Sequence, residues 1–194
     1  MRVLALQGSP RKEGNTELLL HEAVRGAREQ GAEVTVYHLN DLNIKPCQQC
    51  GDCYETGQCI IQDDIQAIHA DIKSCDRIIV ASPIFFFSVS AQLKIVIDRC
   101  QTFWYQKYIH KKNIPAGAYG RKGLLLLVGG MKQTDSNVGF QCAEAVVRAF
   151  FRTVSVPEHV TCTYDNIDEK GAIKDHPTAL QEAYEEGSRL CDKK

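Results

Sequence analysis

The sequence predicts an α/β protein whose core is a five-stranded parallel sheet in the order 2-1-3-4-5, covered by helices on both faces. Short apolar runs alternate with segments of helical periodicity along the 194 residues, which is typical of this class. The apolar runs are continuous, as in strands that are buried on both faces. Hydrophobic residues make up 44% of the chain, so a single domain over residues 1–194 is expected to bury one core.

Each element is predicted from its own pattern. Five apolar runs are expected to be strands, the last with the least regular pattern: Arg2–Gln7, Glu33–His38, Arg77–Ala81, Gly123–Val128 and Thr153–Val160. Five segments have helical periodicity: Thr16–Gln30, Asp64–Ser74, Ala91–Trp104, Ser136–Phe151 and Pro177–Cys191. With this strand order, a ligand belongs at the carboxyl ends of the first and third strands, where the winding direction reverses.

Composition excludes several classes of partner. The 23 basic and 24 acidic residues give a net charge of −1, so neither nucleic acid nor an anionic lipid surface is an expected partner. No apolar stretch approaches the roughly 18 residues of a membrane span, and no secretory leader is recognisable. Four of the nine cysteines fall within thirteen positions, which indicates metal ligation in a reducing compartment rather than a disulfide framework. A cytoplasmic protein without membrane association is therefore expected.

The loop Gly8–Thr16 has the features of a phosphate site. It follows the first strand and leads into the first helix, so backbone N–H groups and the helix dipole favour an anion there. Ser9, Asn15 and Thr16 can add hydrogen bonds, and Arg11 can supply a charged fork. The glycine spacing matches neither a Walker loop nor a dinucleotide fingerprint. The alternative is an ordinary strand-to-helix turn capped by Asn or Thr.

The loop after the third strand, Ser82–Lys94, carries three successive aromatic residues, Phe85–Phe87. A phosphate loop and an aromatic shelf at one switch point suit a mononucleotide with a flat ring system. The alternative is that these phenylalanines belong to the core, although three in a row cannot all face the same way.

The cysteine-rich segment has the spacing C-x2-C-x2-C-x5-C, formed by Cys47, Cys50, Cys53 and Cys59. Two consecutive x2 gaps let three thiolates converge on a cubane cluster, as in the opening of the bacterial ferredoxin motif. Zinc sites usually separate two C-x2-C knuckles by a longer loop, so zinc is the weaker choice. The alternative is that the four thiols are reduced and bind nothing. A further aromatic and basic segment, Trp104–Lys122, is predicted as a lid, as part of a dimer interface or as a solvated loop.

Two spaced motifs resemble the NAD(P)H-dependent FMN reductases of the flavodoxin superfamily: Gly8–Thr16 and Ser82–Arg99. The resemblance implies a three-layer flavodoxin-like fold that binds FMN. Its implied phosphate ligands are Ser9, Arg11, Asn15 and Thr16. Its implied ring contacts are Pro83, Ile84, Phe85 and Phe86, with Gly129 and Gly130 at the pyrimidine edge. The cysteine-rich segment resembles the motif of iron–sulfur flavoproteins, which implies a [4Fe–4S] cluster on its four cysteines.

The predicted function is transfer of hydride or electrons from NAD(P)H through FMN to a small acceptor such as a quinone or a flavin. Because the flavin carries this chemistry, no catalytic acid or base is assigned. The alternative is an iron–sulfur flavoprotein that relays electrons between FMN, a [4Fe–4S] cluster and a ferredoxin-like partner. A third option is a flavin-binding regulatory protein without turnover. A homo-dimer or homo-tetramer is expected from the resemblance.

Overall fold

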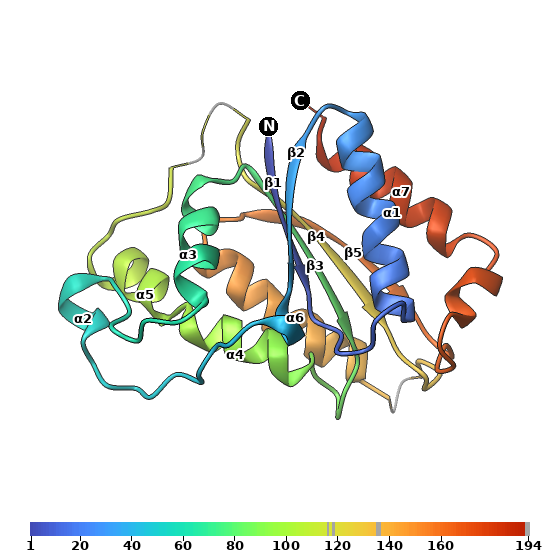
Figure 1. Ribbon diagram of the computed structural model, residues 1–194, viewed down its shortest axis with the longest axis horizontal. Helices are drawn as coiled ribbons and strands as arrows, with labels where there is room; N and C mark the ends of the chain where they lie inside the picture. The colour runs from blue at the N-terminus through green and yellow to red at the C-terminus, as the bar shows by residue number, and fades with distance from the viewer. Residues whose placement is uncertain (116, 118, 135–136, 193–194) are drawn as a thin grey trace.

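The computed structural model describes residues 1–115, 117, 119–134 and 137–192. Its sheet has five parallel strands in the order β2-β1-β3-β4-β5, which confirms the predicted topology (Figure 1). The strands are β1 (Arg2–Gln7), β2 (Glu33–His38), β3 (Arg77–Pro83), β4 (Lys122–Val128) and β5 (Glu158–Tyr164). The first four lie within a residue or two of the predicted ranges.

Helices cover both faces of the sheet (Figure 1). One face carries α1 (Asn15–Glu29) and α7 (Ala179–Leu190), and the other carries α3 (Ile65–Ser74), α4 (Ala91–Arg99), α5 (Gln101–Trp104) and α6 (Gly139–Thr153). Four short helices complete the described fold: α2 (Cys53–Thr56), the 3-10 turns η1 (Leu39–Asp41) and η3 (Ala172–Asp175), and the π-helical η2 (Tyr105–Ile109). Each face buries its own apolar cluster against the sheet, as expected for a three-layer α/β fold.

The prediction for the fifth strand is wrong at its start. Residues 153–157 finish α6 and form a turn in which Ser155 has φ of 62°, and β5 begins only at Glu158. Val154 and Val156 are buried, but they pack into the core from the turn and not from the sheet. Because β5 is an edge strand, its residues before the buried Tyr164 are exposed or only partly buried, and it lacks the continuous apolar run of the inner strands.

Three helix predictions also differ from the structure. The helix predicted over Ala91–Trp104 is interrupted at Cys100 and continues as α5 and η2. The helix predicted from Ser136 begins at Gly139, and Ser136 itself lies outside the described residues. The last helix begins at Ala179, two residues after Pro177. Among the described residues, no helix is both long enough and apolar enough to cross a bilayer.

Helices α1 and α7 approach one another through glycine. A Cβ atom added at Gly187 would lie 2.0 Å from the carbonyl oxygen of Ala23, and one added at Gly26 would lie 2.1 Å from that of Tyr184. Both distances are far below any real contact, so only glycine permits this spacing. The close packing fixes α7 and the segment before it against α1, and that segment reaches the carboxyl edge of the sheet, where the candidate site lies.

Candidate functional site

The loops that follow β1, β3 and β4 enclose one cavity of about 210 Å³ at the predicted switch point. Nine of the ten predicted cofactor residues line it: Ser9, Arg11, Asn15, Thr16, Pro83, Ile84, Phe85, Gly129 and Gly130. The tenth, Phe86, lines an adjoining cavity of about 620 Å³ that shares Ile84, Phe85, Gly129 and Gly130 with the first. The folded chain therefore brings the phosphate loop and the aromatic bend together.

The amino terminus of α1 forms one end of this cavity. Gly14 is the residue before the helix, and its carbonyl oxygen accepts the N–H of Leu18. Throughout the described ranges, no protein acceptor is found for the backbone N–H groups of residues 15–17. Unpaired amides at a helix start attract an anion, and the helix dipole adds to this. Thr16 is 2% exposed at this position, so its hydroxyl adds a buried donor.

Asn15 has a second role that the sequence does not indicate. Its side-chain nitrogen donates to the carbonyl oxygen of Glu169 at 2.9 Å, and its side-chain oxygen accepts the backbone N–H of Ile173 at 3.2 Å. Both ends of the amide therefore tie the start of α1 to the segment before α7. Binding of phosphate by this side chain stays a prediction.

Arg11 lies at the rim of the cavity and is exposed to solvent. One guanidinium nitrogen donates to the backbone oxygen of Asp168 at 3.0 Å, which leaves the remaining guanidinium N–H groups for other acceptors. The backbone N–H of Arg11 donates to the hydroxyl of Ser9 at 3.1 Å, which shapes the loop. This hydrogen bond joins the rim of the cavity to a segment that lies more than 150 residues away in the sequence.

Ser90 links the phosphate loop to the aromatic bend. Its hydroxyl donates to the carbonyl oxygen of Gly8 at 2.6 Å and accepts the N–H of Leu93, and so caps α4. Its own N–H donates to the hydroxyl of Ser82 at 3.0 Å. Ser82 and Ser90 are fully buried, so these bonds fix the relative position of the β1 and β3 loops.

The aromatic bend is a tight hairpin. Phe85 and Ser88 exchange two backbone hydrogen bonds of 2.9 Å, and Phe86 and Phe87 between them have φ of 47° and 60°. Positive φ at both central positions is the signature of a type I′ turn, which normally contains Asn and Gly. The side chain of Phe86 is fully exposed at the tip, and Phe85 and Phe87 are about half exposed. None of the three is core, so the alternative that these phenylalanines belong to the core is wrong.

Two glycines form the wall opposite the bend. A Cβ atom added at Gly130 would lie 2.9 Å from that of Asp168, and one added at Gly129 would lie 3.2 Å from the ring of Phe140 and 3.3 Å from Ile84. The N–H of Gly129 also donates to the carbonyl oxygen of Tyr164, and the carbonyl oxygen of Gly129 accepts the N–H of Ile167. Any larger residue would narrow the cavity, so the glycines keep room for a flat ring.

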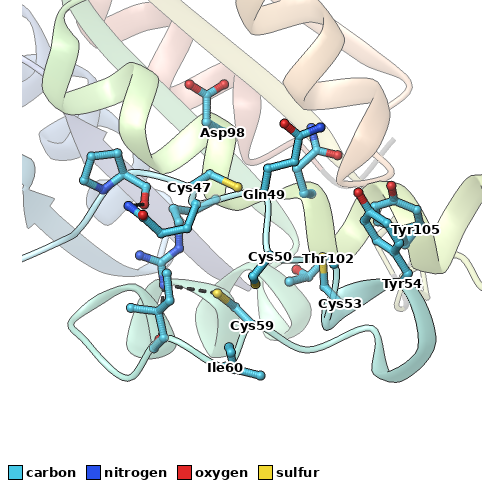
Figure 2. Close-up of a pocket in the computed structure, with 16 residues that line it drawn as sticks. Cys47, Gln49, Cys50, Cys53, Tyr54, Cys59, Ile60, Asp98, Thr102 and Tyr105 are labelled. Carbon is cyan, nitrogen blue, oxygen red and sulfur yellow. Dashed lines mark hydrogen bonds between the residues drawn. The ribbon is translucent and has the colours of Figure 1, made fainter.

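The four predicted cysteine ligands line a separate cavity of about 380 Å³ (Figure 2). This cavity shares no lining residue with the two cavities at the sheet edge. Cys47 and Cys50 are exposed, and Cys53 and Cys59 are partly buried. Burial raises the pKa of the Cys53 thiol, and the charges of Cys47, Cys50 and Cys59 raise it further.

The four cysteines, as the loop is folded here, do not form a site for a single metal ion. Among the residues that the structure describes, no three His, Cys, Asp or Glu side chains converge closely enough to hold one metal ion. A cluster distributes four thiolates over several irons and needs a cavity between them. Gly51 and Gly57, with φ of 93° and 65°, let the loop bend around that cavity.

The segment after α5 covers this loop. The side chain of Gln106 donates to the carbonyl oxygen of Gly57 at 2.5 Å, and a ring nitrogen of His110 lies 2.6 Å from the oxygen of Tyr54. The rings of Tyr54 and Tyr105 stack with centroids 4.1 Å apart (Figure 2). The first part of the predicted lid segment Trp104–Lys122 thus contacts the cysteine-rich loop, while its residues 116 and 118 lie outside the described part of the chain.

A family model described as NADPH-dependent FMN reductase matches residues 1–163. The chain belongs to this family. Membership confirms the resemblance seen in the two spaced motifs.

Several curated relatives of this chain are named iron-sulfur flavoprotein. An iron-sulfur flavoprotein of Methanocaldococcus jannaschii is 46% identical over 99 residues, 51% of each chain. A second one from that organism is 32% identical over 152 residues, 78% of this chain and 71% of the relative. The first match and those to three further iron-sulfur flavoproteins span only 51 to 65% of the relatives' own length.

Solved structures confirm the flavodoxin-like fold of the family. An NAD(P)H:quinone oxidoreductase from Methanothermobacter marburgensis superposes with a TM-score of 0.73 at 18% identity, covering 98% of each chain. An FMN-dependent NADH-azoreductase from Bacillus anthracis gives 0.69 at 14% identity, over 98% of this chain and 99% of the other. At these identities the likeness concerns the fold alone.

Two parts of the site have no assignment from the sequence. Asp168 lines both cavities at the sheet edge. Arg99 lies beneath the cysteine-rich loop and donates to Cys59 at 3.3 Å. Its place inside the predicted helix Ala91–Trp104 gives no sign of a contact 40 residues away in the chain.

Proposed function

We propose that the chain binds FMN in the cavity at the switch point and uses it to pass electrons from NAD(P)H to a small acceptor such as a quinone or a free flavin. The observation that supports this most strongly is the meeting of unpaired helix amides and an aromatic, glycine-walled shelf in one cavity. The unpaired helix amides suit a dianionic phosphate ester, and the aromatic, glycine-walled shelf suits a flat heterocycle.

The residues of the chain supply position and electrostatics in this proposal. When bound, FMN supplies the hydride and electron chemistry. Residues 15–17 and the hydroxyls of Ser9 and Thr16 hold the phosphate, and Arg11 at the rim adds a cation. Phe85 and Phe86 flank the ring, while Gly129 and Gly130 let backbone groups approach its edge. The open second cavity of about 620 Å³ leaves room for a nicotinamide or an acceptor against the ring.

A Thr16→Val variant tests the phosphate site. It keeps the shape of the buried side chain and removes the hydroxyl, so we expect FMN to bind about tenfold more weakly, equivalent to about 1.4 kcal/mol. Thr153→Val is the matched control, because its hydroxyl donates to Ala149 in α6, outside the residues that line the cavity. Equal FMN affinity in wild type and both variants would count against the site. Anaerobic oxidation of NAD(P)H by the FMN-loaded protein tests the reaction.

We also propose a second, compatible function, in which the cysteine-rich loop holds a [4Fe–4S] cluster and the protein relays electrons to or from a ferredoxin-like partner. Four cysteines on the wall of one cavity and the names of the curated relatives support it. In this proposal Cys47, Cys50, Cys53 and Cys59 bind the cluster.

Iron and sulfide analysis of anaerobically prepared protein tests the cluster. We expect about four iron atoms per chain, lost in Cys50→Ser. Cys142→Ser is the matched control, because Cys142 is also exposed but lies in α6, outside the loop. Negligible iron in the wild type, or equal loss in both variants, would reject ligation by this loop.

Assembly and location remain part of the proposal. We infer a homo-dimer or homo-tetramer, since the fully exposed Phe86 and the half-exposed rings beside it are easily covered by a second copy. Sedimentation of the FMN-loaded protein measures this. Nine free cysteines favour a reducing, cytoplasmic environment.

A further inference from the structure

A buried ion pair lies beneath the cysteine-rich loop. Arg99, the last residue of α4, and Asp63, just before α3, face each other at 2.8 Å, and their side chains are 0% and 3% exposed. Such a pair is poor evidence for stability, because the cost of removing two charges from water offsets most of the attraction between them. Its position next to a cysteine ligand therefore needs another explanation.

The guanidinium of Arg99 joins the two ends of the loop. One nitrogen, Nη1, donates to the carbonyl oxygen of Lys45 at 2.6 Å, just before Cys47. The other, Nη2, donates to the carbonyl oxygen of Ile61 at 3.1 Å and to the sulfur of Cys59 at 3.3 Å. The last of these is the dashed line that reaches Cys59 in Figure 2.

Asp63 orients the guanidinium. Its two carboxylate oxygens accept from Nη1 and Nη2, and they also accept the backbone N–H groups of Lys45 and Ile65. The carboxylate thus fixes both nitrogens, so Nη2 has one direction in which to meet the sulfur. A side chain held in this way is built to direct a hydrogen bond.

The acceptor of that bond is informative. A neutral thiol is a weak acceptor for a buried guanidinium, whereas a thiolate or an iron-bound sulfur is a good, charge-assisted one. A second buried arginine in the chain provides a contrast. Like Arg99, Arg121 donates to two backbone oxygens, but it lies farther from its sulfur, that of Cys75, at 3.7 Å, and burial raises the pKa of the Cys75 thiol.

We propose that Arg99, held by Asp63, is the positioning residue of the cysteine-rich loop: its N–H···S bond places Cys59 as the fourth ligand and raises the reduction potential of the [4Fe–4S] cluster. This inference rests on the cluster proposed above. Reduction adds one negative charge to the cluster, and a hydrogen bond from a cation to a ligand sulfur stabilises that charge. Hydrogen bonds to the sulfurs and local charge are among the terms that set cluster potentials.

The two members of the pair have opposite expected effects. Arg99→Lys keeps a charge but loses the fork, so the bond to Cys59 weakens and the potential falls. Asp63→Asn leaves the arginine uncompensated, so the potential rises. We expect each shift to change the ratio of reduced to oxidised cluster at a fixed potential by about tenfold, which is about 59 mV for a one-electron couple. A purely structural pair would not produce shifts of opposite sign.

The experiment is a potentiometric titration of the anaerobically prepared, FMN-containing protein, followed by the electron paramagnetic resonance signal of the reduced cluster. Arg121→Lys is the matched control, because it alters a buried arginine next to a cysteine outside the loop, and its potential should equal that of wild type. Each variant is checked for folding by circular dichroism and for iron content. If one of Arg99→Lys and Asp63→Asn fails to fold, the potential of the other still tests the role of the pair.

The outcomes separate the two proposals. An unchanged potential in a folded, iron-loaded Arg99→Lys or Asp63→Asn protein overturns the role of Arg99 and leaves the cluster intact. Equal shifts in Arg99→Lys and Arg121→Lys overturn it too. A wild-type protein without iron overturns the cluster itself, and this inference with it.

Discussion

Phe86 and Phe87 hold left-handed backbone conformations in a turn that asparagine and glycine usually fill. Each such residue costs on the order of 1–3 kcal/mol and persists only where the surrounding structure imposes it. The hairpin bonds between Phe85 and Ser88 impose it here. The strained turn holds the phenylalanine side chains along the candidate cavity. We therefore interpret the strain as the free-energy cost of presenting aromatic surface to a flat ligand.

A Phe86→Asn variant separates the backbone strain of the turn from the contribution of the aromatic side chain to ligand binding. The side chain of Phe86 is fully exposed in the single chain, so its removal loses no packing within the chain, and asparagine tolerates the positive φ. We expect the free energy of unfolding in urea to rise by about 1 kcal/mol while FMN affinity falls. Ile60→Asn is the control, since Ile60 is exposed but has no positive φ, and it should leave the stability nearly unchanged. A less stable Phe86→Asn protein would contradict the interpretation.

His69 gives stability a pH dependence. Burial lowers its pKa to about 4, and the positive charges of Arg99 and Lys73 contribute. Among the residues that the structure describes, its buried Nε2 has no hydrogen-bond partner, which favours the neutral ring. Between pH 6.5, its ordinary pKa, and about 4, the unfolded chain binds a proton that the folded chain does not.

The free energy of unfolding should therefore decrease as the pH falls through that window, by up to about 3 kcal/mol at about 1.36 kcal/mol for each pKa unit. His69→Phe should flatten this part of the profile, measured by urea unfolding at several pH values. His21→Phe is the matched control, because His21 is exposed. A wild-type slope in His69→Phe would show that another group titrates.

At the scale of elements, the contact between α1 and α7 leaves the least space for a larger side chain. Gly187→Ala places a Cβ atom where the backbone oxygen of Ala23 lies, so the helices must separate. We expect the free energy of unfolding to fall by about 3 kcal/mol, at the upper end of the usual cost of overpacking. Gln181→Ala, on the exposed face of α7, should have little effect by the same urea assay. Similar stability of the two variants would mean that this packing is looser than described.

The elements also show what local pattern can and cannot predict. β1, β3 and β4 are largely apolar runs, β2 alternates apolar with polar residues, and the ranges of all four lie close to those predicted from the sequence. β5 has no continuous apolar run, and its start is decided by the turn at Ser155, which local pattern does not reveal. The break at Cys100 is equally hidden, because the helical periodicity continues through it into η2.

At the scale of the whole molecule, the predicted flavin residues meet because the 2-1-3-4-5 order places the ends of β1 and β3 side by side. That much could be predicted from topology. The tether from Asn15 to Ile173 and the ion pair of Arg99 with Asp63 could not, since each joins residues that are distant in the chain and depends on side-chain direction. Long-range polar contacts of this kind leave no periodic signal in the sequence.

The affinity of the protein for FMN compared with riboflavin tests the proposed phosphate site most directly. The two ligands share the ring and differ in the phosphate, which we place against the unpaired amides of residues 15–17. Fluorescence titration of the flavin-free protein should show FMN binding at least about a hundredfold more tightly than riboflavin, equivalent to about 2.7 kcal/mol. Equal affinity for the two would contradict this placement, because the start of α1 would then not hold a phosphate.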